Sequence, residues 1–223
     1  MESTNAESTK LKRPKHKGSP QLFDNPLLEK LTHTHISFPL IIFSVIAAAL
    51  IYYGIIEKGF KTPEMILLFF AGFIFFTFIE YIAHRYLYHI PATTERRKKI
   101  AYTMHGVHHD YPKDKSRLAM PPLLSLIIAT VFFIIYRVIL GDYAFGFLAG
   151  FLMGYATYLA VHYSIHAFRV PKNILKHLWY HHSIHHYRET DRAFGVSSPL
   201  WDVIFRTMPR KYLKEENSKI QDV

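Results

Sequence analysis

The run FPLIIFSVIAAALIYYGII, from Phe38 to Ile56, contains no charged side chain. Three comparable apolar runs follow it, Met65 to Ile82, Leu123 to Leu140 and Tyr143 to Val161. Each is close to the ~20 residues that a helix needs to cross ~30 Å of hydrocarbon. Backbone groups in lipid must be paired within their own segment, so we expect helices even in FFAGFIFFTF, whose residues favour strands in water. The runs predict an all-α integral membrane protein with four transmembrane helices.

The alternative is that these runs are the buried helices of a soluble protein. Such helices usually carry a polar face, and these runs carry almost none. Of the 223 residues 50% are hydrophobic, yet the formal net charge is +10, so apolar and basic residues are separated along the chain. We divide it into a basic N-terminal tail (1–35), one membrane domain (36–208) and a polar C-terminal tail (209–223).

The basic residues predict the orientation in the membrane. All but three of the 27 lysines and arginines lie before the first run, between the second and third runs, or after the fourth. The positive-inside tendency therefore places both termini and the large loops in the cytoplasm, at a bacterial inner membrane or the endoplasmic reticulum. The polar N-terminus has no signal-peptide pattern. It also lacks interleaved aromatic residues, so we expect contact with lipid headgroups, or a solvated tail, and no nucleic-acid partner.

Eleven of the 15 histidines form four groups at or beyond the cytoplasmic end of a run. In order, they are His84 and His89; His105, His108 and His109; His162 and His166; and His181, His182, His185 and His186. Helical residues three or four apart share a face, so each of the last three groups directs its rings to one point. His84 and His89 are five apart, so this pair needs irregular backbone, and Pro91 can end the helix nearby.

Clustered imidazoles point to metal. Without an ion, such rings would lack partners near the membrane interface, and protonated rings would repel one another. The chain has no cysteine, and neutral imidazole suits zinc, copper, iron and nickel. One ion takes about four to six ligands, so roughly ten nitrogens predict two metal ions. A pH-sensing cluster or a metal carrier is the alternative, and the isolated His16, His33, His35 and His177 are read as ordinary surface or core residues.

The same segments resemble the fatty acid hydroxylase superfamily, and within it the fatty acid 2-hydroxylases. The resemblance covers about Glu80 to Thr207 and rests on EYIAHRYLYH, MHGVHHDYPKDKSRLAMPP, GYATYLAVHYSIH, HHSIHHY and FGVSSPLWDVIFRT, in that order. The family pattern H-x4-H, H-x2-H-H, H-x3-H, H-x2-H-H falls on ten residues. They are His84, His89, His105, His108, His109, His162, His166, His182, His185 and His186. The resemblance implies that these ten bind a dimetal centre in a cytosolic histidine-rich helical cap under a four-helix membrane bundle.

The resemblance also implies the activity, which is dioxygen-dependent hydroxylation of a lipid acyl chain at C2 of a fatty acid or (dihydro)ceramide. Iron is the expected metal of the active enzyme, and zinc can replace it in isolated protein. Many relatives carry an N-terminal haem domain, whereas only 37 residues precede Phe38, so we expect a separate electron-donor protein. His181 lies outside the pattern, either beside a ligand or exchanging with His182. Glu80 and Asp110 are candidates for orienting a ligand ring.

Two other functions remain open. Sterol desaturases and methyl-sterol oxidases have related histidine patterns, although their first pair more often reads H-x3-H. A carrier or store of divalent metal would need strongly polar residues inside the spans, and the first run has only serine and tyrosine.

Some further residues receive specific expectations. Arg85 and Arg117 can pair with a lipid phosphate or carboxylate, the alternative being a plain positive-inside role. Gly195 is expected at a tight turn, and Asp202 at the cap of the helix in VIFRT. The aromatic residues expected to line a groove for an alkyl chain, or else to anchor the spans in lipid, are Phe69, Phe70, Phe73, Phe75, Phe76 and Tyr81.

Overall fold

The computed structural model of the protein describes Lys15 and residues 18–210. Within this part of the chain every regular element is a helix. The predicted tails 1–35 and 209–223 therefore lie partly outside the described residues. His16 lies outside them.

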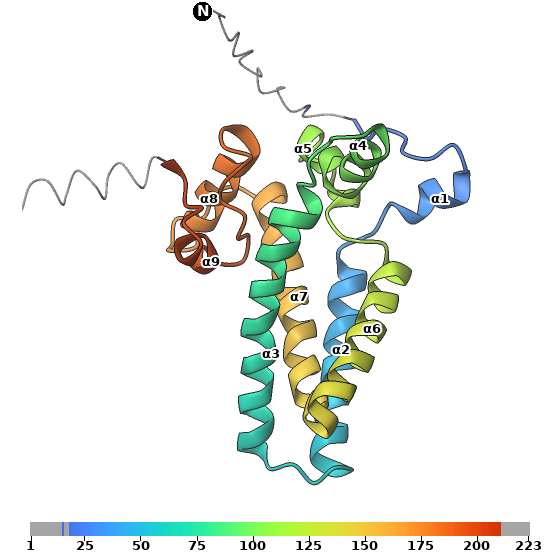
Figure 1. The fold of residues 1–223 in the computed structure, drawn as a ribbon, viewed down its shortest axis with the longest axis vertical. Coiled ribbons are helices and arrows are strands. Elements are labelled where there is room, and N and C mark those ends of the chain that lie inside the picture. The colour runs from blue at the N-terminus through green and yellow to red at the C-terminus, as the bar shows by residue number, and fades with distance from the viewer. Residues whose placement is uncertain (1–14, 16–17, 211–223) are drawn as a thin grey trace, which may run out of the picture.

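Four long helices run side by side along the molecule (Figure 1). They are α2 (Ser37–Ile56), α3 (Thr62–Ile82), α6 (Pro122–Leu140) and α7 (Ala144–Ala167). Each helix contains or largely covers one of the four apolar runs. Helix α7 continues past the end of its run at Val161, and this extension carries His162 and His166.

Helix α7 is the central helix, with buried residues along its whole length, and it packs against α2, α3 and α6. Glycines let α3 and α7 approach closely. A Cβ atom on Gly72 would lie 1.9 Å from the carbonyl oxygen of Phe147, and one on Gly150 would lie 1.8 Å from that of Phe69. Such backbone contact through small residues is typical of helices that pack in membranes.

The outer surface of the bundle is apolar. Val138 is 81% exposed and Leu67 72% exposed, as expected of side chains that face lipid. Three helical stretches among the described residues are long and apolar enough to cross a membrane: Ser37–Ile56, Thr62–Tyr88 and Lys115–Ala167. The last of these contains both α6 and α7. The prediction of an all-helical membrane protein is confirmed at this level.

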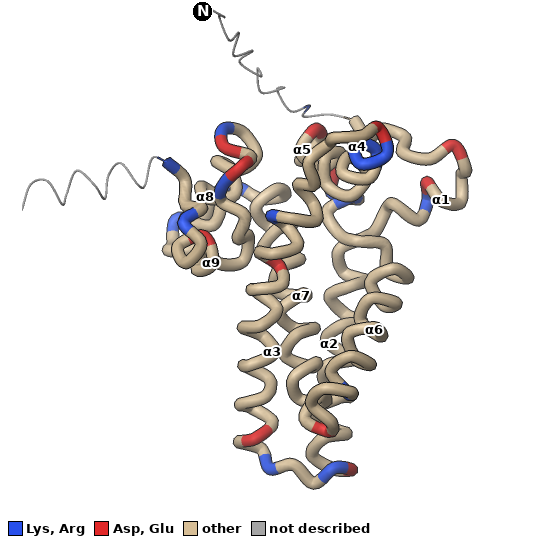
Figure 2. Tube along the Cα trace, viewed as in Figure 1, with Lys and Arg blue, Asp and Glu red and all other residues tan. Residues whose placement is uncertain are grey.

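Short helices form a cap at one end of the bundle (Figure 1). The cap contains α1 (Pro26–Leu31), α4 (Glu95–Ala101), α5 (Val107–Asp110), α8 (Lys176–Tyr187), α9 (Leu200–Ile204), the π-helical turns η1 (Ala83–Tyr88) and η2 (Tyr102–Gly106), and the 3₁₀ turn η3 (Lys115–Arg117). At the opposite end, the 3₁₀ turn η4 (Gly141–Tyr143) joins α6 to α7. Figure 2 shows that charged residues gather at the two ends of the molecule, mostly in the cap.

Candidate metal centre

The first histidine pair lies on irregular backbone, as its spacing predicts. His84 is in the π-helical turn η1, and His89 follows that turn with φ −100° and ψ 39°. A π-helix bonds each residue to the one five positions along, so residues five apart come onto one face. The ring centroids of His84 and His89 are accordingly 5.2 Å apart. The second π-helical turn, η2, carries His105.

The remaining pairs lie on ordinary helical turns. His162 and His166 are one turn apart on α7, with ring centroids 4.8 Å apart. On α8, the centroids of His182 and His186 are 4.5 Å apart. The end of α7 and the face of α8 therefore present their imidazoles to each other across the cap.

The ten predicted ligands come together as two groups of five, and each group could hold a metal ion. The first group is His84, His89, His105, His109 and His185; the second group is His108, His162, His166, His182 and His186. Within each group the candidate ligand atoms all lie within 4.8 Å of one another. Chain neighbours divide between the groups, because His108 and His109 belong to different groups, as do His185 and His186.

Distances between ring nitrogens fit a shared cation. The Nε2 atoms of His84 and His105 are 3.0 Å apart, as are those of His108 and His162. Two nitrogens at right angles around one ion, each about 2.1 Å from it, would be about 3.0 Å apart. The Nε2 atom of His182 lies 3.0 Å from the Nε2 atoms of both His166 and His186.

Hydrogen bonds alone leave several of these rings unsatisfied. The Nε2 atom of His109 is buried without a hydrogen-bond partner among the described residues, and the Nε2 atom of His182 meets two other ring nitrogens, those of His166 and His186. A neutral imidazole carries one N–H, so its other nitrogen needs a donor or a metal. A cation within each group would supply partners to the ring nitrogens that converge there, so the residues fit a metal centre.

Burial favours the neutral form of seven rings in the two groups. Burial lowers the pKa of His89 to about 4 and the pKa of His109 to about 3, and neighbouring histidines add to the effect on His109. Burial first, and neighbouring histidines second, lower the pKa well below the ordinary value in His105, His108, His182, His185 and His186. Neutral imidazole is the form that binds a metal.

Two backbone carbonyls orient rings of the first group. The Nδ1 atom of His84 lies 2.5 Å from the carbonyl oxygen of Phe194, and that of His185 lies 2.7 Å from the carbonyl oxygen of Arg192. Such a contact places the ring proton on Nδ1 and leaves Nε2 free for a metal. Ala193, between the two carbonyls, has φ +58°, a left-handed conformation that costs a non-glycine residue energy and clusters at functional sites.

The buried carboxylate of Asp202 holds this loop in place. Its oxygens accept hydrogen bonds from the backbone N–H groups of Phe194 and Gly195 at 2.9 and 2.7 Å, and from the hydroxyl of Thr207 at 2.7 Å. His181 contributes its Nε2 atom, 3.0 Å from Oδ2. His181 therefore contacts Asp202 and belongs to neither metal-binding group, and the expectation that Asp202 caps a helix is wrong. Asp202 lies inside α9 and supports the loop.

The expectation for Glu80 is also wrong. Its carboxylate accepts hydrogen bonds from the backbone N–H groups of Val196 and Ser197, at 2.7 and 3.0 Å, and from the hydroxyl of Ser197. It therefore anchors the loop, and no ring nitrogen is among these partners. The Asp110 carboxylate accepts a hydrogen bond from the Tyr102 hydroxyl at 3.4 Å, and a role in orienting a ligand ring stays a prediction.

The turn at Gly195 follows the expectation. A Cβ atom there would lie 2.1 Å from the carbonyl oxygen of Ser198 and 2.9 Å from Oδ2 of Asp202. Only glycine fits between this turn and the carboxylate that supports it. The carbonyls of Arg192 and Phe194, by contrast, were missed, because a backbone acceptor has no signal in the side-chain sequence.

An apolar cavity of about 280 Å³ leads from the bundle to the first group. Its lining includes Phe43, Phe132 and Phe151 at one side and His84 and Tyr88 at the other. Of the six aromatic residues expected to line a groove, Phe76 lines this cavity. Tyr81 instead stacks on Phe205 and contacts Thr207 through its hydroxyl.

A second cavity, of about 290 Å³, lies on the cap side. It is lined by His105 from the first group, by His108 and His162 from the second group, and by Arg117. The two cavities share the lining residues Tyr88, Met120, Tyr155 and Tyr158. The two cavities therefore adjoin, and histidines of both groups are among their lining residues.

Fold and site define a helical membrane protein with a histidine-lined candidate metal centre. Comparisons with known proteins agree. The model of the fatty acid hydroxylase family matches residues 69–207, a range that holds all ten histidines. The chain belongs to the fatty acid hydroxylase family.

Individual relatives are similar over much of the chain. The dihydroceramide fatty acyl 2-hydroxylase FAH1 of Arabidopsis thaliana is 31% identical over 155 residues, which cover 69% of this chain and 65% of that protein. The fatty acid 2-hydroxylase of Mus musculus is 35% identical over 158 residues, which cover 68% of this chain and 42% of that protein. This chain thus spans under two thirds of the length of these two relatives.

A solved structure has the same fold. The structure of full-length Scs7p, in which only the hydroxylase domain is visible, superposes with a TM-score of 0.81 at 32% sequence identity. The superposition covers 88% of this chain and 75% of that chain.

Proposed function

We propose that the protein hydroxylates a lipid acyl chain with dioxygen, at C2 of a fatty acid or of a (dihydro)ceramide. The observation that carries this proposal is the meeting of an apolar cavity with two groups of five histidines. The names of the relatives support the acyl substrate and the 2-position. In the reaction one oxygen atom enters the C–H bond and the other leaves as water, with two electrons and two protons supplied from outside.

Two ions held by the two groups, iron in the active enzyme, would supply the activation of dioxygen when bound, which zinc in the same nitrogens would not. The chain's own residues would hold the ions and orient the ligand rings and the substrate. The Arg192 and Phe194 carbonyls fix the rings of His185 and His84. The apolar cavity excludes water from an alkyl chain and aligns it with the first group.

We also infer four membrane crossings. As one straight helix, the stretch Lys115–Ala167 of 53 residues would be about 80 Å long, far more than a bilayer requires. Gly141, with φ +59°, and the turn η4 break it between α6 and α7, so each half suits one crossing. The distribution of basic residues supports a topology with both termini and the cap in the cytosol, and we propose a tail at 1–35, the hydroxylase domain at 36–208 and a second tail at 209–223.

The partners follow from the chemistry. The substrate is a lipid of the same membrane, dioxygen is the co-substrate, and we propose a separate protein as electron donor. A bacterial inner membrane or the endoplasmic reticulum would supply all three.

Lipid analysis of an expressing strain tests the proposal. Growth under ¹⁸O₂ should yield acyl chains that carry one ¹⁸O atom at C2. His108→Ala and His185→Ala, one change in each group, should abolish this product and lower the iron content measured by elemental analysis. His177→Ala is the matched control, because His177 is an exposed histidine of α8 outside both groups. Full activity in both variants would refute the proposal, and label found only in sterols would favour a sterol oxidase.

A further inference from the structure

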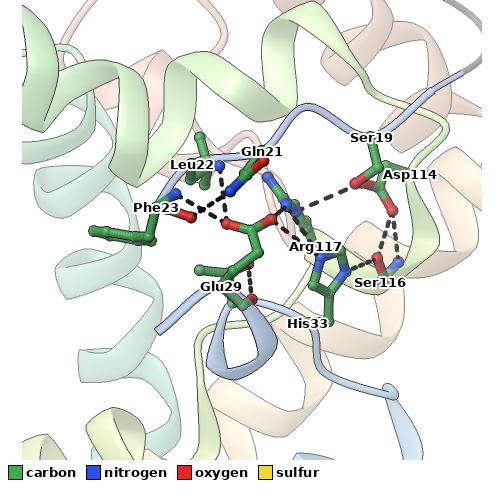
Figure 3. A network of polar contacts seen from close by, with 10 residues as sticks. Ser19, Gln21, Leu22, Phe23, Glu29, His33, Asp114, Ser116 and Arg117 are labelled. Carbon is green, nitrogen blue, oxygen red and sulfur yellow. Dashed lines mark hydrogen bonds and ion pairs between the residues drawn. The ribbon is translucent and has the colours of Figure 1, made fainter. Parts of the chain in front are cut away.

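Arg117 occupies a partly buried polar network at the cap side of the second cavity (Figure 3). Its side chain is 5% exposed. The Nη2 atom donates to the carboxylate of Glu29 and lies 3.0 Å from Nε2 of His33. The carboxylate of Asp114 lies 3.8 Å from Nε, which is an ion-pair distance but too long for a hydrogen bond.

Most donors of this guanidinium are unused. The group has five N–H bonds, and Nη2 accounts for two of them. The Nη1 and Nε atoms, which carry the other three, are buried and have no hydrogen-bond partner among the described residues. Buried donors without acceptors cost free energy, so a site that retains them usually receives an acceptor from elsewhere.

The position of Arg117 suggests which acceptor. Arg117 lines the same 290 Å³ cavity as His105, His108 and His162. This cavity shares its lining residues Tyr88 and Met120 with the apolar cavity that suits an alkyl chain. A lipid whose chain lies in the apolar cavity would therefore pass the histidines and bring its polar part towards Arg117.

The net charge around Arg117 indicates which polar group of a lipid could bind there. The single positive charge of Arg117 faces two carboxylates, those of Glu29 and Asp114, both ionised at neutral pH. Arg117 and the two carboxylates together carry a net charge of about −1. A free carboxylate or a phosphate bound at the buried guanidinium would meet this negative charge, and water would screen the repulsion only in part. An uncharged oxygen can accept from the unused donors without that repulsion.

We propose that Arg117 binds an uncharged acceptor oxygen of the lipid substrate, an amide carbonyl or a hydroxyl. Glu29 and Asp114 make this subsite reject free fatty acids. The inference rests on the proposed function, because it takes the cavity lipid to be the substrate. It also gives the segment before α2 a role, since Leu22, Phe23 and Thr32 line the same cavity and Glu29 accepts the backbone N–H groups of Leu22 and Phe23.

Equilibrium binding to purified, metal-loaded protein tests the subsite. N-palmitoyl ceramide and palmitate would compete with a fluorescent acyl probe, and no turnover is needed. Arg117→Gln should weaken ceramide binding about tenfold or more, the expected loss of hydrogen bonds to a charged group. Palmitate binding should weaken by a smaller factor than ceramide binding, because the added net negative charge acts on the carboxylate but no substrate hydrogen bond is lost. Lys115→Gln is the matched control, since it removes an exposed charge from the same turn and should change neither affinity.

Glu29→Gln tests the charge argument. Its amide oxygen can still accept the N–H groups of Leu22 and Phe23, while one negative charge disappears. Palmitate should then bind several-fold more tightly, and ceramide nearly as in wild type. Arg117→Lys keeps a charge opposite Glu29 but lacks the fork of donors, so it should lose the preference for ceramide even if Arg117→Gln fails to fold.

Metal content and melting temperature separate a structural role from a binding role. If both Arg117 variants bind both lipids as wild type does, or lose both affinities equally, the subsite is refuted. A wild-type protein that prefers ceramide but never hydroxylates any lipid would refute the proposed function and leave the subsite standing. If the enzyme hydroxylates lipid but the Arg117 variants bind both lipids as wild type does, the subsite is refuted and the proposed function stands.

Discussion

Asp202 is the residue on which the orientation of two ligand rings depends. It accepts hydrogen bonds from the loop that carries the Arg192 and Phe194 carbonyls, and these carbonyls contact the rings of His185 and His84. A carboxylate in such an indirect position acts through geometry, without touching the metal.

Asp202→Asn should weaken metal binding at the first group. An amide cannot accept every hydrogen bond that the carboxylate accepts, so the loop loosens, and support of this kind is worth about 10–100-fold in metal affinity. Competition with a metal chelator measures the change. Asp191→Asn is the control, because Asp191 is exposed and paired with Arg210 at the surface. Equal affinities in the two variants would show that the loop does not set the ring orientation.

Residue chemistry was predictable where it resides in side chains. Spacing identified the histidine clusters, since imidazoles on one helical face must converge, and the resemblance to the hydroxylase family implied which ten are ligands. The division of the ten into two groups could not be predicted, because spacing gives the helix face on which a ring lies and not the ring that lies opposite it. Glu80 was assigned wrongly for a similar reason. It lies one turn from His84 in the chain, but its nearest donors belong to the loop at Val196.

Among the elements, the long helices were predictable and the π-helical turns only partly so. An apolar run in lipid has no alternative to a helix, so α2, α3, α6 and α7 follow directly. The spacing of His84 and His89 required irregular backbone, but nothing local specified a π-helix. That choice comes from the demand that both rings reach one group.

The contact of α3 with α7 positions His84 of the first group, which lies just after α3, relative to His162 and His166 of the second group on α7. Gly150→Ala should force the helices apart, because its Cβ atom would lie 1.8 Å from the Phe69 carbonyl oxygen, and overpacking of this kind costs about 1–3 kcal/mol. We expect a lower melting temperature together with lower metal content. Ala48→Leu, at an exposed position of α2, adds more volume and should change neither. A Gly150→Ala protein as stable and as metal-rich as wild type would contradict this packing.

For the molecule as a whole, the buried histidines couple stability to pH. Burial lowers the pKa of His89 to about 4 and of His109 to about 3, whereas the unfolded chain takes up protons near pH ~6.5. The unfolded state therefore binds more protons below that pH, and stability must fall as the pH decreases from there towards about 4 and 3.

Melting temperatures of metal-free protein, recorded in detergent from about pH 8 to pH 5, check this expectation. The melting temperature should be nearly constant above pH ~6.5 and fall below it. His109→Gln should reduce the slope, and His177→Gln should not. A flat profile in the wild type would mean that the rings are accessible to protons in the folded protein.

Metal removal should destabilise the whole molecule, because ions that bind only the folded state add to its stability. The cap is drawn from distant parts of the chain, and the two groups connect η1, η2, α5, α7 and α8. Chelation should lower the melting temperature, and titration back should restore it at two ions per chain. Recovery at one ion per chain would contradict the assignment of one ion to each group.

Neighbours in the chain belong to different groups, since His108 and His109 divide between the groups, as do His185 and His186, so they would bind different ions. Binding of one ion would fix the positions of α5 and α8, and these two helices also carry ligands for the second ion. Loading should consequently be cooperative, with chains that are either empty or doubly filled and few in between.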